Sequence, residues 1–254
     1  MVFVMKSLIS KILCRLGYSI RRNKAFHDEL PGLSESDRLI LKNCHLYSLI
    51  TPEKMYANLL AINYLVSNNI VGSLAECGVW RGGSMMAMMM QLIRMGDEGR
   101  GCYLFDTFTG HVTPTDRDRS WYMTSEQAAQ QHESGADGSH NSWCFASMEE
   151  VLRNVSTTSY PQEMIQLVKG DVAKTLVNTD TGPLALLRLD TDFYASTKIE
   201  MEVLFPRLVP GGVLILDDYG SWEGSREAVD EYISENNIRI FLHRIDRAGR
   251  IAVK

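Results

Sequence analysis

A glycine-containing turn at residues 76–84, with the sequence ECGVWRGGS, limits the fold of this chain more than any other feature. It follows a short apolar run and precedes a long apolar segment, so it predicts a strand, a tight turn and a helix N-terminus. Glycines let a backbone approach a ligand closely. The free N–H groups and the positive end of a helix favour a negatively charged ligand group. The turn therefore predicts a cofactor site.

Strand-like and helix-like segments alternate along the rest of the chain. Strands are expected at residues 73–77, 102–105, 165–168, 184–189 and 213–216, and a hairpin at 239–245 and 250–253. Helices are expected at residues 52–67, from the glycine turn to about 95, from 148, at 195–208 and at 222–236. Strands that alternate with helices indicate a parallel sheet, and the hairpin adds an antiparallel edge. We expect an α/β, Rossmann-like fold with helices on both faces of a mostly parallel sheet.

The chain is expected to hold one domain, at residues 48–254, preceded by a basic helical arm at residues 1–47. The first 25 residues contain six basic residues and no acid, around a rough apolar stripe. Such a basic amphipathic segment is able to contact an anionic membrane surface or a partner subunit through residues 1–24, but a solvated or packed arm is the favoured interpretation. No cleavage site follows, so no signal peptide is expected. The polar residues 107–147 are predicted to form a lid or substrate-binding insertion.

Composition excludes several classes of protein. The net charge of −5 argues against a nucleic-acid binder. The five cysteines include no CxxC pair, which indicates reduced thiols in a cytoplasmic protein rather than a zinc or disulfide framework. The methionines clustered at residues 85–90 are expected to pack in the core.

Nearly every expected strand ends in an acid. These acids are Glu76, Asp106, Asp171, Asp190 and Asp217. Ligands bind at the carboxyl ends of the strands in an open α/β sheet, so we expect the acids to meet in one cleft. Each acid taken singly also fits a helix cap.

Asp106 follows the glycine turn at the distance expected of an acid that binds ribose hydroxyls, which suits both NAD and S-adenosylmethionine. A dinucleotide fingerprint needs glycine at position 80, where this chain has Trp80. The pattern therefore favours S-adenosylmethionine, with Ser84 and Arg81 near its carboxylate. An NAD-binding oxidoreductase is the less favoured alternative.

A second group of acids indicates a metal. Asp190, Asp192, Asp217 and Asp218 bring four carboxylates from two strand ends toward one point. Such carboxylates repel one another unless a cation or proton neutralises them. A set of oxygen ligands selects a hard ion, so we expect Mg²⁺. The alternative is that some of these acids cap helices.

Five segments closely resemble the macrocin-, mycinamicin- and novobiocin-type sugar O-methyltransferase family, over about residues 48–254. They are ECGVWRGGS, LFDTF, LLRLDTDFY, PRLVPGGVLILDDYG and RIAVK. The resemblance implies a class I methyltransferase with a seven-stranded sheet, dependent on S-adenosylmethionine and Mg²⁺. It also implies a sugar-containing acceptor in a glycan, glycolipid or natural product, and a homo-oligomer. The insertion departs most from the antibiotic-modifying members, and a small phenolic acceptor is the alternative.

The resemblance assigns roles to individual residues. The cofactor set is Glu76, Gly78, Trp80, Arg81, Gly82, Gly83, Ser84, Asp106, Thr107, Phe108, Ser147 and Asp171. The metal set is Asp190, Asp192, Asp217 and Asp218, with Asp190 the least certain ligand, and Asp192 is also the expected base. His111, His132 and His140 in the insertion are rival bases, although exposed loop positions are expected for all three.

Overall fold

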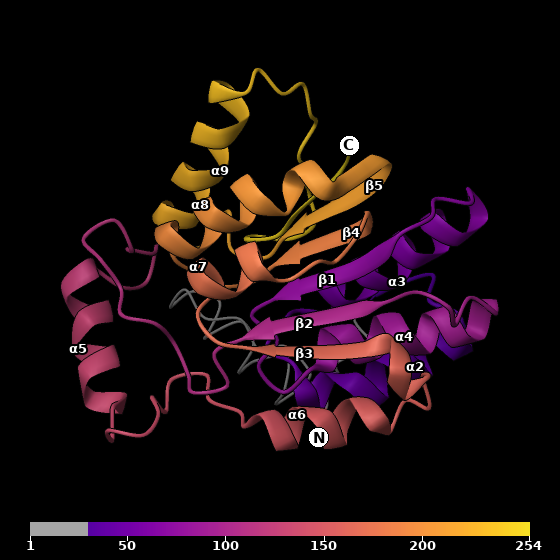
Figure 1. Cartoon of the computed structure of the whole chain (residues 1–254), viewed down its shortest axis with the longest axis horizontal. Helices are drawn as coiled ribbons and strands as arrows, with labels where there is room; N and C mark the ends of the chain where they lie inside the picture. The colour runs from indigo at the N-terminus through magenta and orange to yellow at the C-terminus, as the bar shows by residue number, and fades with distance from the viewer. Residues whose placement is uncertain (1–29) are drawn as a thin grey trace, which may run out of the picture.

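The strand that precedes the glycine turn is an interior strand of a seven-stranded sheet in the computed structural model, which describes residues 30–254. The strand order is β3-β2-β1-β4-β5-β7-β6, and Figure 1 shows helices on both faces. The strands are β1 (Ser73–Cys77), β2 (Cys102–Asp106), β3 (Ile165–Lys169), β4 (Leu184–Leu189), β5 (Leu208–Leu216), β6 (His243–Arg244) and β7 (Arg250–Val253). Strands β1 to β5 are parallel, whereas β7 is antiparallel to β5 and to β6. The predicted fold class is confirmed.

The helices form two layers, and each layer buries its own core against the sheet. The longer helices are α2 (Glu35–Cys44), α3 (Pro52–Ser67), α4 (Gly83–Met95), α5 (Ser125–Gly135), α6 (Met148–Ser156), α8 (Tyr194–Val203) and α9 (Glu223–Glu235). A single helical turn, α7 (Val172–Thr175), and four short 3₁₀ turns complete the set of described helices. One core cluster joins α2, α3, α4 and α6 to one face of the sheet, and the other joins α7, α8 and α9 to the opposite face.

Helix ends agree closely with their sequence signals. Thr51 caps α3, its side chain accepting the N–H of Lys54, and Pro52 occupies the first helical position. Ser147 caps α6 by accepting the N–H of Glu150. A full capping box does not form here, because the side chain of Glu150 pairs with Arg81.

The insertion that follows β2 contains a helix that the sequence analysis did not predict. Helix α5 begins after Thr124, which forms a reciprocal capping box with Gln127. Only Ala128 of this helix is buried, so its apolar periodicity is weak. In Figure 1, α5 stands apart from the sheet on the side toward which the parallel strands point.

The described part of the predicted N-terminal arm belongs to the main core. Leu41 and Cys44 of α2 are fully buried in the same cluster as α3 and α4. The predicted boundary at residue 47 therefore does not separate two packing units. The predicted membrane contact of residues 1–24 lies outside the described residues. Within residues 30–254, no helix is long and apolar enough to cross a bilayer.

Two predicted elements are shorter than expected. The helix expected at 195–208 ends at Val203, and a 3₁₀ turn (Phe205–Arg207) leads into β5. Of the strand expected at 239–245, only His243 and Arg244 pair with β7. The side chains of both residues are exposed, so a longer edge strand would gain little stability from side-chain burial.

Candidate functional site

A cavity of about 320 Å³ lies at the carboxyl ends of β1, β2, β4 and β5. This volume falls within the range of about 300–1,000 Å³ that is typical of small-molecule sites. The strand order reverses between β1 and β4, and open α/β sheets bind their ligands at such a point. The acids that were predicted to meet at this edge, with the exception of Asp171, all line the cavity.

The glycine turn is held in place by Asp106. One carboxylate oxygen of Asp106 accepts the N–H groups of Val79 and Trp80, at 2.8 and 3.1 Å. The other oxygen accepts the N–H of Phe108 at 2.8 Å. The Thr107 hydroxyl lies 3.4 Å from this second oxygen, but its single proton goes to the Gly110 carbonyl at 2.6 Å. The second oxygen therefore keeps one acceptor position toward a ligand. Asp106 therefore shapes the turn, and its predicted contact with ribose stays a prediction.

Gly78 is required by its close contact with another strand end. Its backbone is left-handed, with φ of 78°, and a Cβ atom there would lie 1.9 Å from the backbone oxygen of Asp190. Any side chain at position 78 would push the β1 and β4 ends apart. This glycine serves the packing of the two strand ends that carry the cofactor turn and the acids.

The predicted cofactor residues divide into two groups. Those that line the cavity are Glu76, Gly78, Trp80, Ser84, Asp106 and Thr107. Those that do not line it are Arg81, Gly82, Gly83, Phe108, Ser147 and Asp171. The guanidinium of Arg81 pairs with Glu150 at 2.6 Å and bonds the Leu46 carbonyl at 3.0 Å, and Asp171 caps α7.

Three of the four predicted metal acids lie close together. Asp190, Asp192 and Asp218 each offer a carboxylate oxygen, and these oxygens lie within 4.8 Å of one another. We call these residues the acid trio. Burial, followed by repulsion from Asp192, raises the pKa of Asp218 well above its ordinary value. Burial also raises the pKa of Asp190, to about 6, although Arg188 opposes that rise.

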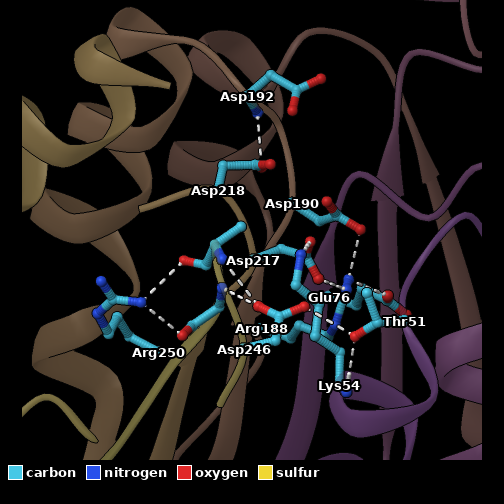
Figure 2. A network of polar contacts seen from close by, with 12 residues as sticks. Thr51, Lys54, Glu76, Arg188, Asp190, Asp192, Asp217, Asp218, Asp246 and Arg250 are labelled. Carbon is cyan, nitrogen blue, oxygen red and sulfur yellow. Dashed lines mark hydrogen bonds and ion pairs between the residues drawn. The ribbon is translucent and has the colours of Figure 1, made fainter. Parts of the chain in front are cut away.

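The fourth predicted acid, Asp217, points into a buried ion-pair network. Its two oxygens pair with Arg188 and Lys54, as Figure 2 shows. Arg188 is completely buried and also binds Glu76 at 2.8 Å and Asp190 at 2.7 Å. Both oxygens of Asp217 are therefore paired with cationic side chains, and its predicted role as a metal ligand stays a prediction.

Glu76 keeps one carboxylate oxygen without a partner among residues 30–254. The Glu76 side chain is 1% exposed and lines the cavity; its first oxygen binds Arg188, and the second has no hydrogen-bond partner. Burial is the main reason that the pKa of Glu76 rises to about 8, with Arg188 opposing the rise. An unpaired buried acceptor at the edge of a cavity suits a donor group on a ligand.

His111 is not the exposed loop residue that was expected. Its side chain is 11% exposed, and Nε2 lies 3.1 Å from a carboxylate oxygen of Asp192. Its ring packs on Trp143 and Phe193, with centroid distances of 4.7 and 5.2 Å. Burial alone would lower the pKa of His111, but pairing with Asp192 raises it to about 10. By contrast, His132 bonds the His111 carbonyl.

An aromatic wall lines one side of the cavity. Tyr122 and Trp143 come from the insertion and Trp222 from the start of α9, and the Tyr122 and Trp222 rings meet edge to face at 5.9 Å. Burial, then the charges of Asp192 and Asp218, raises the pKa of Tyr122 to about 12. The sequence analysis missed Tyr122, Lys54 and Arg188, and only Arg188 had a clear signal, as a charge inside the apolar strand LALLRL.

Comparison with known proteins places this geometry in a family. The macrocin O-methyltransferase (TylF) family matches residues 26–252. One relative is 8-demethyl-8-(2,3-dimethoxy-alpha-L-rhamnosyl)-tetracenomycin-C 4′-O-methyltransferase of Streptomyces olivaceus. It is 33% identical to this chain over 188 residues, which make up 74% of this chain and 68% of that protein. Demethyldecarbamoylnovobiocin O-methyltransferase of Streptomyces niveus is 33% identical over 186 residues, 73% of this chain and 67% of that protein.

A solved structure agrees with these relatives. The O-methyltransferase NovP superposes with a TM-score of 0.70 at 29% sequence identity, covering 82% of each chain. The two proteins therefore share their fold over most of each chain.

Proposed function

Because the chain belongs to the macrocin O-methyltransferase family, we propose that it transfers a methyl group from S-adenosylmethionine to a sugar hydroxyl with the help of Mg²⁺. The acceptor is a sugar in a glycan, a glycolipid or a glycosylated natural product. Membership of an O-methyltransferase family overturns the alternative of an NAD-binding oxidoreductase, and the sugar-modifying relatives favour a sugar over a small phenol.

One observation carries the proposal. The cavity joins the glycine turn of β1 to the acid trio at the ends of β4 and β5, so one space offers a cofactor position and an acceptor position side by side. Holding two reactants in one geometry supplies a large part of the acceleration in a transfer reaction.

The cofactor position suits the methionine end of S-adenosylmethionine. An ammonium group on the ligand would favour the ionised form of Glu76, whose oxygen without a partner would then accept its hydrogen bond. Ser84 at the start of α4 lies beside the N-terminal end of the helix dipole. The remaining acceptor position on Asp106 suits a ribose hydroxyl.

The acid trio suits Mg²⁺ by its chemistry. It supplies only oxygen ligands, which hard cations prefer. Burial, and then repulsion between neighbouring carboxylates, raises the pKa values of Asp190 and Asp218, and a cation relieves that repulsion. When bound, Mg²⁺ supplies electrostatic stabilisation of the oxygen that becomes nucleophilic.

Asp192 is the proposed base. Burial would raise its pKa, but His111 outweighs burial and lowers the pKa, so the carboxylate stays ionised near neutral pH. The acceptor oxygen attacks the methyl carbon as the carbon–sulfur bond breaks. The hydroxyl proton moves to Asp192, and S-adenosylhomocysteine leaves. His111 fixes the orientation of Asp192, because its own Nε2 faces that carboxylate.

Calorimetry followed by an acceptor screen tests the proposal. S-adenosylhomocysteine should bind and NAD should not. Methyl transfer to vicinal-diol sugars should then require Mg²⁺ and stop in excess chelator. Full turnover in chelator would remove the metal from the proposal, and transfer to phenols but not to sugars would overturn the acceptor class.

The homo-oligomer that the family resemblance implies also stays a prediction.

A further inference from the structure

The outer rim of the cavity carries two neighbouring aromatic rings on the insertion. Tyr122 lines the cavity, and Trp121 lies beside it with a centroid distance of 5.0 Å. Their exposed fractions are 53% for Tyr122 and 57% for Trp121, high values for large aromatic residues. A run of aromatic surface that continues outward from a reaction centre suits a ligand longer than one sugar ring.

An arginine of the β6–β7 hairpin is stacked on this surface. The guanidinium carbon of Arg247 lies 3.4 Å from the centroid of the Trp121 ring. The hairpin is held against the rim, since the N–H of Gly220 donates to the Ala248 carbonyl at 2.8 Å and Ser221 lines the cavity. Arg247 therefore lies next to the opening of the cavity.

Arg247 differs from nearby arginines in its charge balance. Arg119 pairs with Glu223, and Arg117 lies near Glu227 and Glu231. Across residues 30–254, no carboxylate pairs with Arg247. The adjacent Asp246 accepts the N–H groups of Ala248 and Gly249 and the hydroxyl of Thr51. The guanidinium is thus oriented by stacking, while its donors remain available.

The charges at the two ends of the cavity have opposite signs. The acid trio lies in the cavity lining and repels an anion, whereas Arg247 lies outside the lining, stacked on Trp121 beside Tyr122, and attracts one. A planar guanidinium binds phosphate and carboxylate groups through paired hydrogen bonds. An acceptor with a neutral sugar inside and an oxyanion outside would satisfy both ends.

We infer that the acceptor carries a phosphate or carboxylate group next to the sugar that is methylated, and that Arg247, held on Trp121, binds this group. This inference rests on the proposed function and specifies its substrate class. Tyr122 then packs against the sugar, and Trp121 supports the anion site.

Calorimetry on the complex with S-adenosylhomocysteine tests the inference, with and without Mg²⁺. The probes are inorganic pyrophosphate, uridine diphosphate and glucuronate, which separate phosphate-linked from carboxylate-bearing acceptors. The Arg247→Gln substitution should weaken binding of the tightest-binding probe at least fivefold. Arg244→Gln, which removes an exposed arginine of the same hairpin, should change the affinity less than twofold.

Each outcome separates this inference from the proposed function. Absence of S-adenosylhomocysteine binding would count against the methyltransferase proposal itself. Normal binding of S-adenosylhomocysteine with equal probe affinity in the Arg247→Gln variant and the unsubstituted protein would overturn only the anion site. If none of the probes binds at 10 mM, roughly the weakest useful affinity, the anion site would be overturned as well.

Discussion

At the scale of single residues, the strongest sign of function is the backbone of Asp192. This residue has φ of 66°, in the left-handed region that residues other than glycine rarely adopt. Its N–H donates to the Asp218 carboxylate at 3.1 Å, so the strained turn ties two members of the acid trio together. Strain of this kind costs about 1–3 kcal/mol and persists where the surrounding structure enforces it. The turn places the Asp192 carboxylate beside His111 and the cavity.

Replacement of this carboxylate tests its role as the base. Asp192→Asn should lower kcat about 100-fold or more, the usual range for loss of general base catalysis, and leave the affinity for S-adenosylhomocysteine within about twofold. Asp116→Asn, at an exposed acid of the insertion, is the matched control and should keep full activity. Near-normal turnover of the Asp192→Asn enzyme at saturating Mg²⁺ would show that another group accepts the proton.

Glu76 makes a prediction about pH and stability. Its folded-state pKa is about 8, above its ordinary value of 4.5, chiefly because it is buried. Between these two values the folded protein holds a proton that the unfolded chain releases. The free energy of unfolding therefore loses this contribution as pH rises from about 5 to about 8. In urea unfolding experiments, the difference in free energy of unfolding between the unsubstituted protein and the Glu76→Gln variant should shrink or reverse over that pH interval. Parallel pH profiles for the two proteins would contradict the raised pKa.

The acids were predictable because each follows an apolar strand, and strand ends meet at one edge of a parallel sheet. Their partners were less predictable. Lys54 lies on a helix far from Asp217 in sequence, and nothing in its local pattern indicates that it is buried. The same holds for His111, which reaches Asp192 only because the insertion folds back over the sheet edge. Long-range pairing of charges depends on tertiary packing, which periodicity does not encode.

At the scale of elements, the start of the insertion is a fixed wall of the site. Asp118 is 1% exposed, and one of its oxygens accepts the N–H of Tyr194, in the first turn of α8. Its other oxygen accepts both the N–H and the hydroxyl of Thr115. This carboxylate fastens the segment that leads to Tyr122 onto α8, the helix that follows Asp190 and Asp192.

Removal of this fastening should loosen acceptor binding and spare the cofactor. Asp118→Ala should cost about 1–2 kcal/mol of stability, as loss of a helix N-cap does, and raise the KM for the acceptor several-fold. Thr124→Ala removes the cap of α5 and serves as the control, with a similar loss of stability and an unchanged KM. Hydrogen exchange should increase at residues 112–123 only in the Asp118→Ala variant. Unchanged hydrogen exchange and an unchanged KM in the Asp118→Ala variant would show that the wall does not depend on Asp118.

The elements that the sequence predicted best are those that the sheet buries. β1 and β4 have their predicted bounds, since a central parallel strand is a continuous apolar run. Helix α5 was missed because a helix that buries one residue has almost no apolar stripe, although the Thr124–Gln127 capping box was a usable signal. The edge strand β6 was overestimated because an apolar run at residues 240–242 need not pair with a neighbouring strand.

At the scale of the whole molecule, the sheet order brings the two halves of the reaction together. The glycine turn follows β1, and the acid trio follows its neighbour β4 and the next strand, β5. Two separate core clusters support this edge of the sheet from opposite faces. The fold and the meeting of the acids at one sheet edge were therefore predictable from strand ends, whereas the aromatic wall was not.

The central claim is that S-adenosylmethionine and a divalent cation share this cavity. Paramagnetic broadening of bound S-adenosylhomocysteine by Mn²⁺ in NMR spectra tests it most directly. We predict strong broadening of the signals of the methylene groups beside sulfur, and its loss in the Asp218→Asn variant despite normal S-adenosylhomocysteine binding. Bound S-adenosylhomocysteine that Mn²⁺ leaves sharp in the unsubstituted protein would contradict the account.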